Sequence, residues 1–130
     1  MAVLEKHLYL ASRSARRRDL LKQMGVNFEM LMLRDGGGRD ADFDETPLLD
    51  ELPSDYVVRV ARLKAHAGWL RLEQRRLIRH PVLAADTTVA LDNQILAKPR
   101  DREEAVAMLQ RLSATTHQVY TAVSVKYYDS

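Results

Sequence analysis

Three consecutive arginines, Arg16, Arg17 and Arg18, follow an apolar segment and a loop that contains serine. The apolar segment, residues 8–11, predicts a short buried strand, and the arginines would open the helix after it. The first turn of a helix already carries positive partial charge, so arginines are unfavourable there unless an anion is bound. Phosphate is the usual anion at such a helix end. The segment therefore suggests a protein that binds a polyphosphate.

Two carboxylates could serve a metal ion or an attacking water molecule. Asp86 directly follows a continuously apolar segment, residues 81–85, which predicts a buried strand. Ligands of open α/β sheets bind beyond the carboxyl ends of strands, so a carboxylate there is well placed. A turn or capping aspartate explains its position equally well. Glu45 lies in an acidic loop and could add a second carboxylate, although most acidic loops are simply solvated.

Three further side chains have the chemistry to contact a nucleotide. Thr87 offers a hydroxyl for phosphate or base, or it simply continues the strand as a β-branched residue. Lys98 precedes Pro99, which restricts it to an extended conformation, so its ammonium would project from a defined point. Lys64 lies in the middle of a predicted helix, where a surface lysine that snorkels to solvent is the alternative. Together with the arginines, these residues describe basic groups for a triphosphate and carboxylates for a cation.

The composition limits the chemistry. A chain of 130 residues is long enough for one domain with a hydrophobic core. It contains no cysteine, which excludes disulfides, thiolate metal sites and cysteine nucleophiles. Its four histidines show no paired spacing, so a hard ion such as Mg²⁺, held by carboxylates and phosphate oxygens, fits better than zinc.

Charge and hydropathy argue against a nucleic-acid partner and against a membrane-spanning segment. The net charge is only +2 and aromatic residues are 6% of the chain, so a nucleic-acid partner is not expected. No apolar run reaches transmembrane length. The N-terminus is too short and polar for a signal peptide, and a cytoplasmic protein is expected.

Strand and helix patterns alternate along the chain, which predicts an α/β fold. Ser14 is expected to cap the arginine-led helix, which would end at Gly25 and place Leu20, Leu21 and Met24 on one face. Ser54 is expected to cap a long helix whose apolar positions repeat at helical spacing around Lys64. Helices are predicted over 16–24, from 54 onward and over 101–112. Strands are predicted over 8–11, 28–33, 81–85, 89–91, 94–97 and 116–128, with a hairpin turn at residues 92–93.

The chain also resembles the Maf family of nucleoside triphosphate pyrophosphatases. Each matching block is short, but the blocks occur in the family's order over nearly the whole sequence. They are Leu-Ala-Ser-Arg-Ser-Ala-Arg-Arg at 10–17, Glu45 with Pro47, Tyr-Val-Val-Arg-Val-Ala-Arg-Leu-Lys-Ala at 56–65, Ala-Asp-Thr-Thr-Val at 85–89, Ile-Leu-Ala-Lys-Pro at 95–99, Glu104-Ala105 with Met108-Leu109, and Leu112-Ser113 with His-Gln-Val at 117–119. The Asp-Thr-Thr and Lys-Pro blocks look more like the branch that acts on dTTP and UTP.

The resemblance implies a Maf/ITPase-like mixed sheet flanked by helices, with a nucleotide-binding cleft. It implies an enzyme that hydrolyses dTTP, UTP or modified nucleotides to the monophosphate and pyrophosphate, with Mg²⁺ or another divalent cation such as Mn²⁺ or Co²⁺. By the same resemblance, the metal and the attacking water are served by Glu45 and Asp86, with Asp86 as proton acceptor. The substrate is held by Ser14, Arg16, Arg17, Lys64, Thr87 and Lys98, of which Thr87 helps to select the base and Arg17 lies near the specificity determinants.

The sequence departs from the family pattern in three places. Ala15 replaces a proline that stiffens the loop before the helix, and Ala114 replaces a glycine. The family also continues past residue 130, so residues 1–130 are expected to form a single Maf-like domain that lacks the C-terminal segment. The alternative function is therefore a truncated, catalytically impaired domain that binds nucleotide or a protein partner without turnover. A homodimer across the exposed final strand would stabilise such a domain.

Overall fold

The computed structural model describes residues 7–12, 14–31, 33, 43–96, 101–113 and 117–128. Its elements, in chain order, are β1 (His7–Leu10), α1 (Ala15–Gln23), β2 (Asn27–Met30), α2 (Pro53–Gln74), β3 (Val82–Leu91), β4 (Gln94–Leu96), α3 (Arg102–Ser113) and β5 (Gln118–Lys126). This mixture of helices and strands confirms the predicted α/β class. Residues 34–42, which belong to the acidic loop predicted around Glu45, and the predicted phosphate ligand Lys98 lie outside the described residues.

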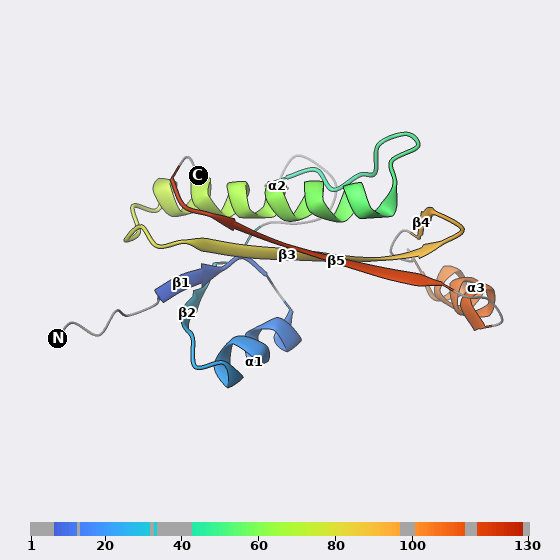
Figure 1. Ribbon diagram of the computed structural model, residues 1–130, viewed down its shortest axis with the longest axis horizontal. Helices are drawn as coiled ribbons and strands as arrows, with labels where there is room; N and C mark the ends of the chain where they lie inside the picture. Colours follow the sequence, from blue (N-terminus) through green and yellow to red (C-terminus); the bar gives the residue numbers. More distant parts are fainter. Residues whose placement is uncertain are drawn as a thin grey trace.

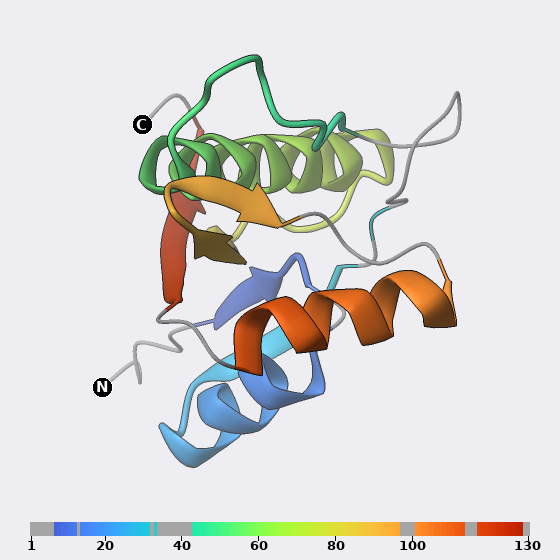
Figure 2. The same cartoon turned by 90° about the vertical axis from the view of Figure 1, so that its right-hand side faces the viewer.

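β3 is the central strand of a mixed sheet that has five strands within the described residues. β1 pairs in parallel with β2 and with the start of β3, at Val82 and Leu83. β4 pairs antiparallel with the end of β3, and β5 pairs antiparallel with nearly its whole length. Figure 1 shows α2 lying along one face of this sheet. Figure 2 shows α1 and α3 on the side of the strands away from α2.

The boundaries of α1 follow from its flanking residues. Ser14 has extended backbone angles and its Oγ accepts the N–H of Arg17 at 3.3 Å, so the predicted N-cap is confirmed. Gly25 has a φ of +73°, the left-handed conformation that ends a helix, as predicted. Of the three apolar residues that are predicted to share one face of this helix, Leu21 is buried, whereas Leu20 and Met24 are 51% and 72% exposed.

α2 is a helix of 22 residues whose apolar stripe covers the sheet. The predicted stripe is confirmed, with these residues buried and Lys64 half-buried beside them: Tyr56, Val57, Val60, Ala61 and Ala65. The predicted cap is wrong. The helix begins at Pro53, after Leu52, and Ser54 lies exposed in its first turn. Proline is favoured at that first position because it has no N–H to leave unpaired.

Gly68 lies where α2 approaches the sheet most closely. A Cβ atom there would lie 2.7 Å from Val82 Cγ1 and 3.2 Å from Ala11 Cβ. Val82 is fully buried, and its branched side chain has few alternative rotamers. We expect Gly68→Ala to lower the free energy of unfolding by about 1–3 kcal/mol through overpacking. The cost of overpacking should outweigh the gain of about 1 kcal/mol that replacing glycine by alanine otherwise brings to a helix interior.

Urea denaturation of the Gly68→Ala variant measures this loss directly. Shortening the neighbour in the double variant Gly68→Ala, Val82→Ala is expected to cost less than the sum of the two single changes, because the methyl group then has space. A denaturation midpoint for Gly68→Ala at or above that of the wild type would show that β3 leaves enough space for a side chain at residue 68.

β3 runs unbroken from Val82 to Leu91, whereas the sequence predicts two shorter strands on either side of Asp86. β5 accounts for the difference, since it pairs with β3 from Val82 to Ala90 and so keeps residues 86–88 extended. The hairpin prediction is confirmed. Asp92 and Asn93 have φ angles of 52° and 61°, as a two-residue turn between β3 and β4 requires.

β5 has two faces of different character. Tyr120 and Ala122 pack against the cluster of Tyr56, Val57 and Val60. The alternate residues Val119, Val123 and Val125 are 58%, 65% and 57% exposed, so the apolar face away from α2 is open within the described structure. At the start of α3, which is predicted over residues 101–112, Asp101 Oδ1 accepts the N–H of Glu104 at 2.9 Å and so caps the helix.

Candidate functional site

Four of the predicted site residues, Arg17, Lys64, Asp86 and Thr87, lie beside the middle of β3. Its start pairs with β1 and its end pairs with β4. Between these two strands, residues 84–88 have β5 on one side, and the described part of the chain places no strand on the other. Asp86 and Thr87 lie in this interval. The prediction that Asp86 follows a strand end is wrong for β3 itself, but β1 ends beside this interval, so the site lies at the carboxyl end of a parallel strand as expected.

Asp86 forms an ion pair with Lys64 on the α2 face of the sheet. The Lys64 Nζ atom lies 2.9 Å from Asp86 Oδ1 and also donates to the Ala85 carbonyl oxygen at 3.3 Å. Asp86 is a buried residue, 8% exposed, and Lys64 comes from the middle of α2. A buried carboxylate needs such a partner, because an unpaired charge is costly away from water. The structure thus joins two predicted site residues as one pair.

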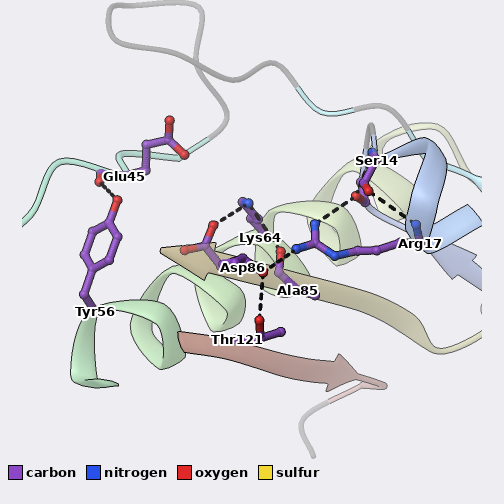
Figure 3. A network of polar contacts seen from close by, with 10 residues as sticks. Ser14, Arg17, Glu45, Tyr56, Lys64, Ala85, Asp86 and Thr121 are labelled. Atoms are coloured by element: carbon purple, nitrogen blue, oxygen red, sulfur yellow. Dashed lines mark hydrogen bonds and ion pairs between the residues drawn. The ribbon is translucent and has the colours of Figure 1, made fainter. Parts of the chain in front are cut away.

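Thr87 points to the opposite face of the sheet, because successive residues of a strand alternate. There its Oγ1 accepts a hydrogen bond from Arg17 Nη2 at 3.0 Å and lies 2.9 Å from Thr121 Oγ1. Arg17 Nη1 also donates to Ser12 Oγ at 3.4 Å. Figure 3 shows Arg17 reaching from α1 toward β3, with Lys64 and Asp86 meeting beside the same strand. The two groups of polar residues therefore approach the same open interval from two faces.

The N-terminus of α1 borders this second group. Its first turn carries Arg16, Arg17 and Arg18, of which Arg17 is half-buried and the other two are exposed. Ser14 Oγ accepts the Arg17 N–H, which confirms its role as the cap, and the prediction that Ser14 also binds substrate stays a prediction. The partial positive charge of the helix end and the arginine guanidinium groups together favour a bound anion, as the sequence suggests.

The main chain of Glu45 is held by a side chain of α2. The Tyr56 hydroxyl donates to the Glu45 carbonyl oxygen at 2.7 Å. Burial raises the pKa of Tyr56 to about 12, and the negative charges of Asp86 and Glu45 act in the same direction. Both carboxylates therefore lie near enough to the phenol for their charges to act on it, one on β3 and one in the segment before α2.

A carboxylate pair can help to hold a divalent cation that arrives with phosphate. Among the residues that the structure describes, no cluster of three or more His, Asp or Glu side chains could bind a metal ion by itself. Mg²⁺ typically takes one or two carboxylates and completes its shell with water and substrate phosphate oxygens. The oxygen donors of Glu45 and Asp86 fit that requirement in kind.

Three residues of the site were not predicted from the sequence. Ser12 and Thr121 join the Arg17 and Thr87 network, and Tyr56 holds the Glu45 main chain. Ser12 belongs to the loop after the first strand, where a hydroxyl beside the arginines was a usable signal. Thr121 shows no local signal, because its contact depends on the register between β3 and β5.

The ion pair between Arg59 and Glu51 should make the stability of the fold depend on pH. Arg59 Nε lies 2.7 Å from Glu51 Oε2. The hydrogen bond from Arg59 lowers the pKa of Glu51 below its usual value of 4.5, while burial opposes this shift. A carboxyl whose folded pKa is depressed stabilises the fold above its unfolded pKa, and this contribution is lost as pH falls through the folded pKa.

We therefore expect the wild type to lose more stability than Glu51→Gln as the pH is lowered from about 6 to about 3. Urea midpoints of both proteins across this range measure the difference. If the two curves run parallel, the ion pair does not contribute to acid unfolding.

Comparison with known proteins agrees with the fold. The family model for Maf-like protein matches residues 7–129. A dTTP/UTP pyrophosphatase of Nitrosomonas europaea is 58% identical over 120 residues, which are 92% of this chain and 58% of the relative. A dTTP/UTP pyrophosphatase of Aromatoleum aromaticum is 52% identical over 126 residues, 96% of this chain and 61% of the relative.

The fold and site define an α/β domain with a basic helix N-terminus beside a buried carboxylate. The chain belongs to the Maf-like protein family, because the family model covers nearly all of it. It spans about three fifths of the length of the curated relatives that it matches. Within the described residues, no helix is long and apolar enough to cross a membrane.

Proposed function

We propose that the chain is, or is part of, a nucleoside triphosphate pyrophosphatase that acts on dTTP and UTP. The supporting observation is the meeting of two charged groups at the open interval of β3. One group is the Lys64–Asp86 pair, and the other is Arg17 with Thr87. The printed names of the relatives, dTTP/UTP pyrophosphatase, give the substrate class.

In the proposed reaction a water oxygen attacks the α-phosphorus of the substrate. A new P–O bond forms to water, and the bond between the α-phosphorus and the bridging oxygen breaks. Pyrophosphate leaves with the electrons of that bond, and Asp86 accepts the proton of the water. Such chemistry depends chiefly on positioning and on stabilising charge that spreads over the phosphate oxygens.

The cationic side chains have the corresponding roles. Arg16, Arg17 and Lys98 neutralise the triphosphate. Ser14 caps α1 and helps to hold the triphosphate at the N-terminus of this helix. Lys64 shares its charge between Asp86 and the phosphate. Thr87, oriented by Arg17, contacts the base or sugar edge and contributes to its selection.

Glu45 and Asp86 would hold Mg²⁺, Mn²⁺ or Co²⁺ together with the substrate. Such an ion supplies a positive charge that polarises phosphate oxygens and favours ionisation of water. Nucleoside triphosphates are cytoplasmic metabolites, and we place the reaction there. A homodimer across β5, whose apolar residues are exposed, stays a prediction.

The direct test is pyrophosphate release from dTTP, UTP, dCTP and ATP in the presence of Mg²⁺ or Mn²⁺. We expect release from dTTP and UTP to exceed that from the other nucleotides. Reaction in ¹⁸O-labelled water should place the label in the monophosphate, since water attacks the α-phosphorus. Binding of dTTP without any pyrophosphate release would instead support the non-catalytic nucleotide-binding alternative.

A further inference from the structure

The segment before α2, residues 43–52, contains Glu45 and is fastened to that helix at two neighbouring points. Tyr56 donates its hydroxyl to the Glu45 carbonyl oxygen at 2.7 Å. Arg59 Nη2 donates to the Thr46 carbonyl oxygen at 3.0 Å. Consecutive peptide groups are thereby held by two side chains that lie three residues apart on one helical face. Two adjacent attachments limit both the position and the rotation of the chain at Glu45.

Contacts within the segment make this attachment stiffer. Arg59 also donates Nε and Nη2 to the two oxygens of Glu51, at 2.7 and 2.9 Å. The Leu48 N–H donates to Glu51 Oε1 at 3.0 Å. The Thr46 N–H donates to Asp44 Oδ1 at 2.9 Å. A planar guanidinium fixed by a bidentate carboxylate loses little freedom when it binds one more acceptor, so it suits the role of an anchor.

The tyrosine is rigidly placed. Tyr56 is 9% exposed and belongs to a buried cluster with Val57 and Val60. Phe43 of the segment also packs against this cluster. A buried phenol normally hydrogen-bonds through its oxygen, and here the acceptor is the Glu45 main chain. Figure 3 shows the Tyr56 hydroxyl directed at Glu45, and Lys64, which lies farther along the same helix, directed at Asp86 of β3.

We propose that Tyr56 and Arg59 are positioning residues that set the Glu45 carboxylate relative to the Lys64–Asp86 pair. The proposal rests on the proposed function, in which Glu45 and Asp86 act on one substrate-bound cation. Because α2 carries Tyr56, Arg59 and Lys64, a single rigid helix fixes the distance between both halves of the site. Neither Tyr56 nor Arg59 contacts the reacting atoms in this arrangement.

The test compares Tyr56→Phe with Tyr120→Phe. Tyr120 packs on the same buried cluster. Within the described residues, its hydroxyl donates a hydrogen bond to the side chain of the exposed Gln118 at 3.1 Å and does not contact the Glu45 segment. Both variants lose one hydroxyl and keep the ring. The first readout is amide hydrogen exchange of the chain without metal or nucleotide. We expect Tyr56→Phe to speed exchange within residues 44–49 by about 2- to 10-fold, as loss of one hydrogen bond implies. Tyr120→Phe should leave these amides unchanged.

The second readout is the Mn²⁺ concentration that gives half-maximal pyrophosphate release from dTTP. We expect this value to rise about 3- to 10-fold in Tyr56→Phe and in Arg59→Lys, with a smaller change in the KM for dTTP. In the double variant Tyr56→Phe, Glu45→Gln, the loss should not exceed that of Glu45→Gln alone, because the tyrosine acts through Glu45.

Three results would overturn the proposal. The first is a loss of activity in Tyr56→Phe, Glu45→Gln that equals the sum of the two single losses. The second is an effect of Tyr120→Phe as large as that of Tyr56→Phe. The third is amide hydrogen exchange in Tyr56→Phe that is unchanged, or that is faster over the whole chain and not only within residues 44–49. If the wild type releases no pyrophosphate, the proposed function fails, and the exchange readout still decides whether Tyr56 fixes the Glu45 segment.

Discussion

The Asp86→Asn variant is expected to release pyrophosphate about 10²- to 10⁴-fold more slowly than the wild type, with little change in the KM for dTTP. That range is typical for removal of a general base. Asparagine has the shape of aspartate and can still accept the Lys64 hydrogen bond through its amide oxygen, so the fold is preserved. It cannot take a proton from water at neutral pH. The loss should therefore appear in kcat, measured by steady-state kinetics.

Asp92→Asn is the matched control for this substitution. Asp92 lies at the far end of β3 in the turn to β4, where its φ is 52°, a conformation that asparagine tolerates well. It is exposed, and none of the contacts of the described residues joins it to the proposed site. The control should keep wild-type activity and thermal stability. If Asp86→Asn retains more than about a tenth of the wild-type kcat, proton transfer to Asp86 does not limit the reaction.

The parts of the fold that depend on residues close together in the sequence were predictable from it. Ser14 caps α1, Gly25 ends it, and the Asp92–Asn93 turn joins β3 to β4. Each of these depends on backbone preferences that act over a few residues. The apolar repeat of α2 was also predictable, because burial on one face requires that spacing.

The arrangement of the site was less predictable, because its contacts join distant segments. Arg17 and Thr87 are 70 residues apart, and Thr87 and Thr121 are 34 apart. The unbroken course of β3 depends on its pairing with β5, which the local pattern around Asp86 does not report. Asp86 and Thr87 therefore point to opposite faces, which a turn after residue 85 would not require. The sequence indicated which residue types matter, and the sheet determines which of them meet.

Replacement of Arg17 by alanine is expected to reduce kcat/KM for dTTP by about 10- to 150-fold. Hydrogen bonds to charged groups contribute about 1.5–3 kcal/mol, which converts to this range. Arg17 is the arginine of the first turn that the structure directs at β3, through Thr87 Oγ1. In the proposed site, its loss removes a phosphate ligand and releases the Thr87 hydroxyl from its hydrogen bond to Arg17. We therefore expect a higher KM and a smaller preference for dTTP over dCTP.

Arg18→Ala and Arg17→Lys separate the causes of this effect. Arg18 is the next residue of α1 and is exposed, so its removal changes the net charge equally while leaving the Arg17 contacts in place. Arg17→Lys keeps the charge but not the planar fork that reaches Ser12 and Thr87 together. If the fork matters, the lysine variant should lose most of the base preference and recover only part of the KM. Equal losses in Arg17→Ala and Arg18→Ala, abolished by added salt, would instead mean that the arginines attract substrate only through their summed charge.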